Sequence, residues 1–270
     1  MLSAIHPNGV AMKKMFGLLL AVFFAIAGSE ALAQISDLNT AINKAGRQRM
    51  LSQRMAKAYF QIGQQVEVER SKKILDASVA TFERQLSELK GFAPTPEIKE
   101  NYLKLDKLWV TYKEVLVGAP PSQDNGRKVL ELSDQVLSLA HQGTVMLEKQ
   151  SGTAAGRLVN ISGRQRMLSQ RMAKFYQAIA WGIGNEKSAE ELEKARKDFV
   201  AAHQELSNAP ANTPQIKDSL ELVKQQWIFF DAALNQKAVA DKRPQINVAT
   251  TSERILEEME VVVGLYEKLK

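Results

Sequence analysis

Apolar residues recur at spacings of three and four along most of the chain, which is the period of an α-helix. Short runs rich in glycine, proline and asparagine interrupt this pattern, and we find no persuasive period of two that would predict a strand. The pattern predicts eight helices, at residues 35–67, 70–91, 96–117, 125–149, 153–183, 186–208, 214–238 and 246–269. Short connections between such helices are typical of antiparallel up-and-down bundles.

A twelve-residue segment occurs twice in the chain. Residues 46–57 read GRQRMLSQRMAK, and residues 163–174 repeat the same letters 117 positions later. Weaker matches follow downstream, such as Trp109 with Trp227. The mature chain is therefore two copies of one module.

The duplication sets the domain organisation and the fold class. We assign residues 34–150 to the first four-helix module and residues 151–270 to the second. The predicted fold is all-α, with two tandem up-and-down four-helix bundles.

The N-terminal 33 residues have the order of a secretory signal peptide. Lys13 and Lys14 precede an apolar run at 15–27, and small residues lead up to Ala33. We predict cleavage after Ala33 and a periplasmic protein. The alternative is an uncleaved N-terminal membrane anchor, although the apolar run is shorter than the roughly 20 residues of a bilayer span.

The composition argues against an enzyme. There is no cysteine, which excludes disulfides, thiol catalysis and cysteine zinc sites. His6, His141 and His203 show no metal-ligand spacing, so we predict no metal, no cofactor and no catalytic residue. His141 and His203 are interpreted as ordinary surface or core residues.

The net charge of +6 comes from the two repeated segments. These segments hold eight cations: Arg47, Arg49, Arg54, Lys57, Arg164, Arg166, Arg171 and Lys174. Because an exported protein is poorly placed to meet nucleic acid, no nucleic-acid partner is predicted. The glutamates between Glu253 and Glu260 are interpreted as a solvated face, and the repeated tryptophans as core.

A helical wheel separates two faces of each repeated helix. One face carries Leu51 and Met55 and faces the bundle core. The other has heptad spacing and consists mostly of small residues around one arginine. Its members are Leu38, Ile42, Ala45, Arg49, Ser52 and Ala56 in the first copy, and Ala155, Val159, Ser162, Arg166, Ser169 and Ala173 in the second. We call these two stripes the seams.

An arginine in a close-packed seam is desolvated and needs an anion. If the two seams face each other, Arg49 and Arg166 converge and can hold one small planar oxyanion, with Gly46 and Gly163 leaving backbone accessible beside it. In the alternative, the arginines bridge to carboxylates on other helices or extend to water, and the repeat serves packing alone. Arg47, Arg54 and Lys57 point away from the seam and are predicted to be solvated. Arg47 and Arg164 are candidate secondary contacts of the anion.

The segment NKAGRQRMLSQRMAK at 43–57 resembles the signature helix of the PilJ/NarX-like sensor family, which includes type IV pilus chemotaxis transducers and nitrate/nitrite sensor kinases. The resemblance implies a periplasmic four-helix sensor bundle. It also implies nitrate contacts at the signature glycine and arginine, which are Gly46 and Arg49 here and Gly163 and Arg166 in the second copy. Such members are usually receptors with transmembrane helices and a cytoplasmic output, and we recognise neither in this sequence.

The linkage of the two modules leaves two geometries open. A tight turn at residues 150–153, with Gly152 ending one helix and Thr153 capping the next, places the bundles side by side as a pseudo-dimer. A continuous helix from about 127 to 183 instead stacks them end to end. The side-by-side form is favoured.

These observations predict an exported, non-enzymatic binding protein for nitrate or nitrite, which buffers the anion or presents it to a membrane receptor or sensor kinase. The alternative is a helical adaptor whose seams pair with a related membrane receptor without binding an anion. A third interpretation is a peripheral protein whose basic helices touch anionic lipid. Further homo-oligomerisation is left open.

Overall fold

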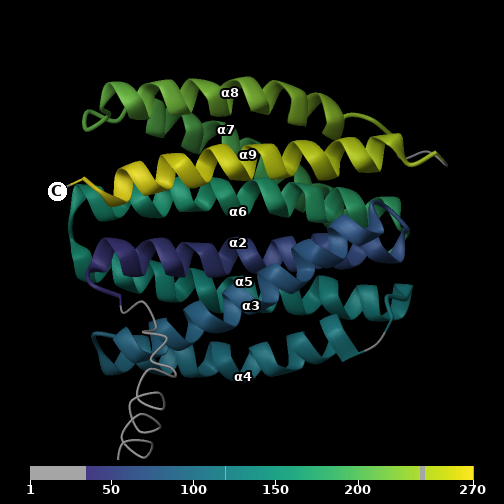
Figure 1. Cartoon of the computed structure of the whole chain (residues 1–270), viewed down its shortest axis with the longest axis horizontal. Helices are drawn as coiled ribbons and strands as arrows, with labels where there is room; N and C mark the ends of the chain where they lie inside the picture. Colours follow the sequence, from purple (N-terminus) through teal and green to yellow (C-terminus); the bar gives the residue numbers. More distant parts are fainter. Residues whose placement is uncertain (1–34, 119, 238–240, 270) are drawn as a thin grey trace, which may run out of the picture. The chain divides into compact units, whose positions relative to one another are not determined.

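The computed structural model describes residues 35–118, 120–237 and 241–269, so the predicted signal peptide lies outside the described residues. Within these ranges the chain forms eight helices and no strand (Figure 1). They are α2 (Leu38–Gly63), α3 (Val68–Phe92), α4 (Pro96–Gly118), α5 (Gln123–Ser151), α6 (Ala154–Ala180), α7 (Glu186–Ser207), α8 (Pro214–Leu234) and α9 (Arg243–Glu267). The predicted all-α class is confirmed.

Side chains at the helix starts explain most of the boundaries. Asp37, Ser122 and Thr213 each accept a hydrogen bond from a backbone N–H of the first turn. The first predicted helix was too long at its end: α2 stops at Gly63, because the chain turns through left-handed conformations at Gln65 (φ 59°) and Glu67 (φ 41°).

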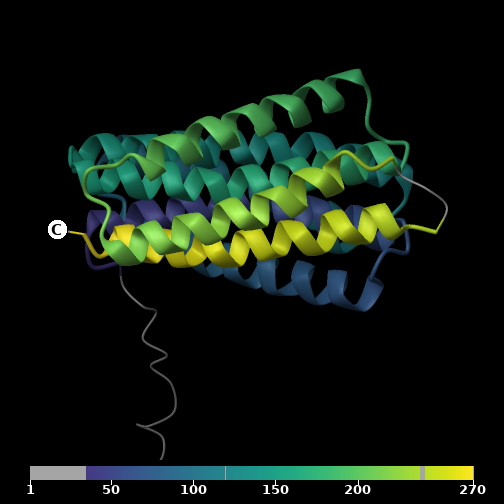
Figure 2. The same cartoon turned by 90° about the horizontal axis from the view of Figure 1, so that it is seen from above.

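The helices form two four-helix bundles in chain order. Seen from above, the helices of both bundles run roughly along the long axis of the molecule (Figure 2). In the first, α2 packs on α3 and α5, and α4 packs on α5 and α3. In the second, α6 packs on α7 and α9, and α8 packs on α9 and α7. Each bundle is therefore an up-and-down ring with its apolar residues inside, as the sequence predicts.

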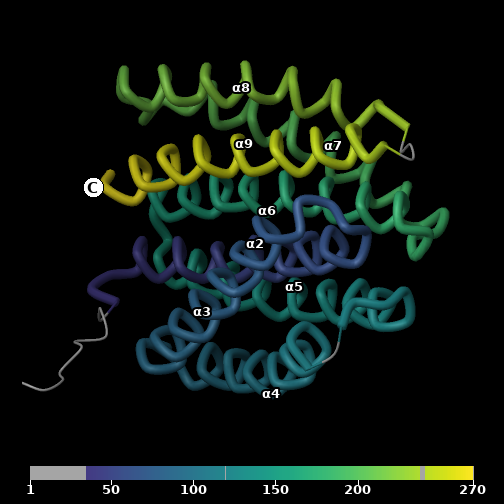
Figure 3. The backbone as a smooth tube through the Cα atoms, turned by 45° about the vertical axis from the view of Figure 1, so that its right-hand side comes forward, coloured from purple at the N-terminus to yellow at the C-terminus, as the bar shows by residue number. Residues whose placement is uncertain are grey.

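The two bundles lie side by side, with α2 packed along α6 (Figures 1 and 3). Gly152 ends α5 with a left-handed φ of 62°, and Thr153 caps α6 by accepting a hydrogen bond from the Gly156 N–H. This tight turn starts α6 beside α2 and in the same direction. The pseudo-dimer geometry is confirmed, and the end-to-end alternative is wrong.

The repeated aromatic residues occupy the same place in each core. Phe82 stacks on Trp109 at a centroid distance of 4.3 Å, and Phe199 stacks on Trp227 at 4.6 Å. These pairs fix α3 against α4 and α7 against α8 in matched positions. Among the described helices, none is long and apolar enough to cross a membrane.

Candidate functional site

The two seams pack directly against each other. Ala45, Ser52 and Ala56 of α2 are fully buried, and so are their counterparts on α6, which are Ser162, Ser169 and Ala173. A Cβ built on Gly46 would lie 3.8 Å from the Cα of Gly163, so the backbones approach closely at this point. The small side chains permit this approach, and a larger one would separate the helices.

The structure brings all four predicted anion-binding residues together. Arg49 and Arg166 have 0% exposed surface. The Cβ position of Gly46 lies 3.2 Å from Arg49 Nη2 and 3.6 Å from Arg166 Nη2. At Gly163 the corresponding distances are 3.4 Å and 3.3 Å. Both guanidinium groups therefore meet over the pair of glycines.

A pseudo-two-fold axis relates the contacts on either side of this point. Gln53 donates to the Ser133 carbonyl at 2.9 Å, and Gln170 donates to the Ser252 carbonyl at 2.9 Å. The lysine that ends each repeated segment pairs with the last helix of the opposite bundle: Lys57 with Glu253 of α9, and Lys174 with Asp134 of α5. Asp134 of α5 and Glu253 of α9 lie 119 positions apart, as do Ser133 and Ser252, so the two helices correspond residue by residue.

Arg166 is neutralised by a carboxylate. Its Nη1 donates to Glu260 Oε2 on α9 at 2.7 Å, and its Nη2 donates to the Asn43 side-chain oxygen at 2.8 Å. The same Glu260 oxygen also accepts from Arg47 of the first bundle. One carboxylate thus binds an arginine from each copy. The alternative of a carboxylate partner therefore holds for Arg166 alone of the two seam arginines.

Arg49 has no such partner among the described residues. Its Nη2 donates to the Asn160 carbonyl at 3.1 Å, and its Nη1 lies 3.3 Å from His141 Nδ1. His141 stands 119 positions before Glu260 and so takes the place of that carboxylate. Because a guanidinium only donates, Nδ1 must accept and the imidazole proton sits on Nε2.

The electrostatics follow from this arrangement. Burial, the charge of Arg166 and the charge of Arg164 lower the pKa of Arg49 to about 9, which leaves it cationic at neutral pH. Burial, Arg49 and Arg164 lower the pKa of His141, so the imidazole stays neutral. The buried pair of arginines therefore carries one positive charge that no directly bound carboxylate of the described chain offsets.

Three buried donors near this charge lack a hydrogen-bond partner within the described chain: Arg49 Nε, Arg166 Nε and the Tyr102 hydroxyl. Burial raises the pKa of Tyr102, so its hydroxyl remains protonated. Leu220 stands at the equivalent position in the second copy, 118 residues later. Unpaired buried donors are costly, and the Tyr102 hydroxyl is the one of these three that the second copy does not repeat.

Several predictions about the other cations are wrong. Lys57 was expected in solvent, but it has 0% exposed surface and pairs with buried Glu253. Arg54 also pairs with Glu253, and Arg47 pairs with Glu260. The predicted solvated face of α9 therefore holds the carboxylates that bind α2. A wheel of α2 alone could not show this, because α9 covers its outer side.

Two residues of the site were missed. His141 was interpreted as an ordinary residue, yet it contacts Arg49, and Tyr102 drew no attention. Aligning the two copies would have singled out both positions, since His141 aligns with Glu260 and Tyr102 aligns with Leu220. Within the described part of the chain, no cluster of three histidine or acidic side chains could hold a metal ion.

Comparison with known proteins agrees with this architecture. The sequence matches the family described as type IV pili methyl-accepting chemotaxis transducer N-term (PilJ) twice, over residues 31–135 and 146–267. Comparisons with curated proteins and with solved structures returned no match. The match covers most of the chain and repeats in step with the two bundles, so the protein belongs to the PilJ family and carries two tandem copies of its sensor-type domain.

Proposed function

We propose that this protein binds one small planar oxyanion, nitrate or nitrite, at the paired first helices between Arg49 and Arg166. In this proposal residues 1–33 export the chain to the periplasm, where the loaded protein buffers the anion or presents it to a membrane receptor or sensor kinase. The two modules, 34–150 and 151–270, then act as a covalent version of a sensor dimer.

The buried, uncompensated charge of Arg49 carries the proposal. A guanidinium with 0% exposure is expensive unless an anion accompanies it, and Glu260 already serves Arg166. Arg49 Nε and the Tyr102 hydroxyl supply donors without acceptors. A planar oxyanion matches both the charge and the fork geometry of a guanidinium.

The adaptor alternative is less well supported. It requires a free seam to pair with the matching helix of a receptor, whereas the two seams here are packed against each other within one chain. The lipid-binding interpretation also loses support, because every cation of the repeated segments except the buried Arg49 is paired with a carboxylate of the bundles. An adaptor of this fold would need another surface.

Calorimetric titration with nitrate and with nitrite tests the proposal. We expect one site per chain, and binding lost in both Arg49→Ala and Arg166→Ala with the helical circular dichroism retained. Arg70→Ala is the matched control, since Arg70 pairs with Glu67 at the start of α3, away from the seam, and its loss should leave binding unchanged. The absence of binding of both anions to the folded wild-type protein would overturn the proposal.

A further inference from the structure

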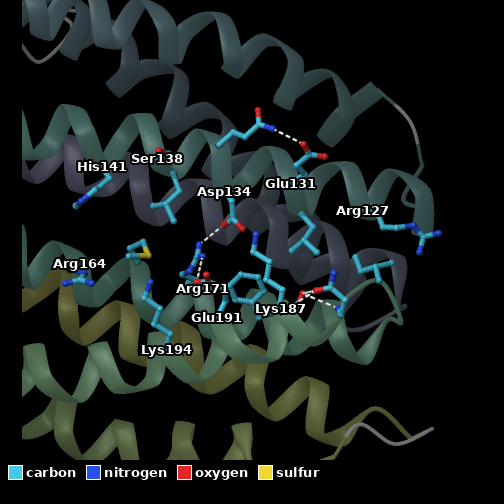
Figure 4. Close-up of a pocket in the computed structure, with 18 residues that line it drawn as sticks. Arg127, Glu131, Asp134, Ser138, His141, Arg164, Arg171, Lys187, Glu191 and Lys194 are labelled. Carbon is cyan, nitrogen blue, oxygen red and sulfur yellow. Dashed lines mark hydrogen bonds and ion pairs between the residues drawn. The ribbon is translucent and has the colours of Figure 1, made fainter.

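A groove of about 950 Å³ runs between α5 and the pair α6 and α7 (Figure 4). This volume is within the range of small-molecule sites. Its apolar lining comes from Leu130, Leu137, Met167, Phe175 and Ile183. His141, Arg164 and Lys194 lie together at one end of the groove, with Arg171 further along it (Figure 4).

The internal symmetry identifies what this end of the groove lacks. In the other half of the molecule, the Glu260 carboxylate binds Arg166 and Arg47. The equivalent arginines here are Arg49 and Arg164, 117 residues away from Arg166 and Arg47 respectively. Between them stands the imidazole of His141, which brings no negative charge. Arg164 donates instead to Asp198 on α7, at 2.7 Å.

We propose that this end of the groove binds the carboxylate of an organic acid. The ligand carboxylate pairs with Arg49 and Arg164, as the Glu260 carboxylate pairs with Arg166 and Arg47 in the other half. The apolar body of the acid lies along the groove. This site is distinct from the oxyanion site between Arg49 and Arg166: it shares Arg49, but its second cation is Arg164.

The lining selects an acid with one carboxylate and an apolar body. In the middle of the groove, Arg171 is already held by Asp134 at 2.6 Å and by Glu191 at 2.9 Å. A second carboxylate there would meet these two acidic groups. Phe175 lines the groove where the first copy has Ala58, with 2% of its surface exposed and the Arg171 guanidinium 4.8 Å from its ring centroid, so the second copy alone has an aromatic side chain at this place.

His141 is the residue through which the ligand reaches Arg49. His141 is exposed and lines the groove, so its ring can turn outward and free the Arg49 Nη1 donor. A carboxylate beside the ring also favours the protonated imidazole, which then donates to the ligand. Ligand binding therefore raises the pKa of His141.

The test is calorimetric titration of the purified protein with benzoate as the probe, and with acetate as a probe that lacks an apolar body. We expect benzoate to bind at one site per chain and at least tenfold more tightly than acetate. His141→Glu, which supplies an internal carboxylate to Arg49, should weaken benzoate binding at least tenfold. Arg164→Ala should do the same, whereas its symmetry mate Arg47→Ala should change the affinity less than twofold.

The outcomes separate this inference from the oxyanion proposal. Nitrate binding should persist in Arg164→Ala, because that site uses Arg49 and Arg166. Nitrate binding without benzoate binding overturns the inference alone, and benzoate binding without nitrate binding overturns the oxyanion proposal alone. The organic-acid inference is also overturned if benzoate binds with unchanged affinity to both folded variants, His141→Glu and Arg164→Ala. An NMR titration in which benzoate fails to raise the pKa of His141 would likewise overturn the organic-acid inference.

Discussion

His141 occupies in the first bundle the position that Glu260 holds in the second. Each side chain contacts the seam arginine of its own bundle: His141 Nδ1 lies 3.3 Å from Arg49 Nη1, and Glu260 Oε2 lies 2.7 Å from Arg166 Nη1. The lysine pairs that cross between the bundles are matched in the two copies. This one substitution leaves Arg49 as a buried cation without a carboxylate, and it makes a symmetric fold into an asymmetric site.

Restoring the missing carboxylate should stabilise the fold. His141→Glu places an acid beside Arg49, and a hydrogen bond to a charged group contributes about 2 kcal/mol. We expect the urea midpoint at pH 7.5 to rise accordingly. Gln142→Glu adds the same charge at the neighbouring exposed position of α5 and should change stability by less than about 0.5 kcal/mol. A His141→Glu protein no more stable than the wild type would show that Arg49 is already compensated.

Gly46→Ala should weaken nitrate binding. The added Cβ would lie 3.2 Å from Arg49 Nη2 and 3.6 Å from Arg166 Nη2, so it displaces the guanidinium groups from the anion site. We expect at least a tenfold loss of nitrate affinity by calorimetry. Stability should change little, because alanine favours a helix over glycine by about 1 kcal/mol and so offsets the strain.

Gly264→Ala on α9 is the matched control for this change. No heavy atom lies within 4 Å of a Cβ at that position, so the variant should gain stability and bind nitrate like the wild type. Equal nitrate affinity in Gly46→Ala and Gly264→Ala would argue that the anion does not sit beside the seam glycines.

Acid should destabilise the contact between the bundles through Glu253. Burial raises the pKa of Glu253, but Lys57 and Arg54 outweigh burial and lower it to about 2, from 4.5. A lowered carboxyl pKa means that its contribution is complete above pH 4.5 and is lost as the pH falls toward 2. We expect up to about 3 kcal/mol to disappear over this range in urea unfolding. Glu253→Gln should remove this loss, and the exposed Glu257→Gln should keep it.

His141 supplies a second, milder pH dependence. Its pKa is lowered by burial and by Arg49 and Arg164, so the neutral form stabilises the fold above pH 6.5, and this contribution is lost as the pH falls through the folded-state value. NMR titration should place the pKa of His141 below 6.5, and Arg49→Ala should raise it. A pKa unmoved by Arg49→Ala would mean that the two side chains do not interact in solution.

The sequence alone predicted most of the fold. The period of the apolar residues located the helices, because an amphipathic helix must turn one face to a core wherever it packs. Glycine at 152 and threonine at 153 predicted the turn that sets the bundles side by side, since both act through local backbone geometry. The heptad of small residues likewise selected Arg49 and Arg166 as residues that meet, with Gly46 and Gly163 one turn before them.

The partners of the arginines were decided only by the tertiary structure. Glu260 and Lys57 looked solvated on their own helices, because a wheel shows one helix and not the neighbour that covers it. His141 reaches Arg49 only through the packing of α5 on α2, across 92 residues of chain. Pairing of charges depends on distances between helices, which local periodicity does not encode, so the asymmetry of the site became visible only when the two bundles were placed together.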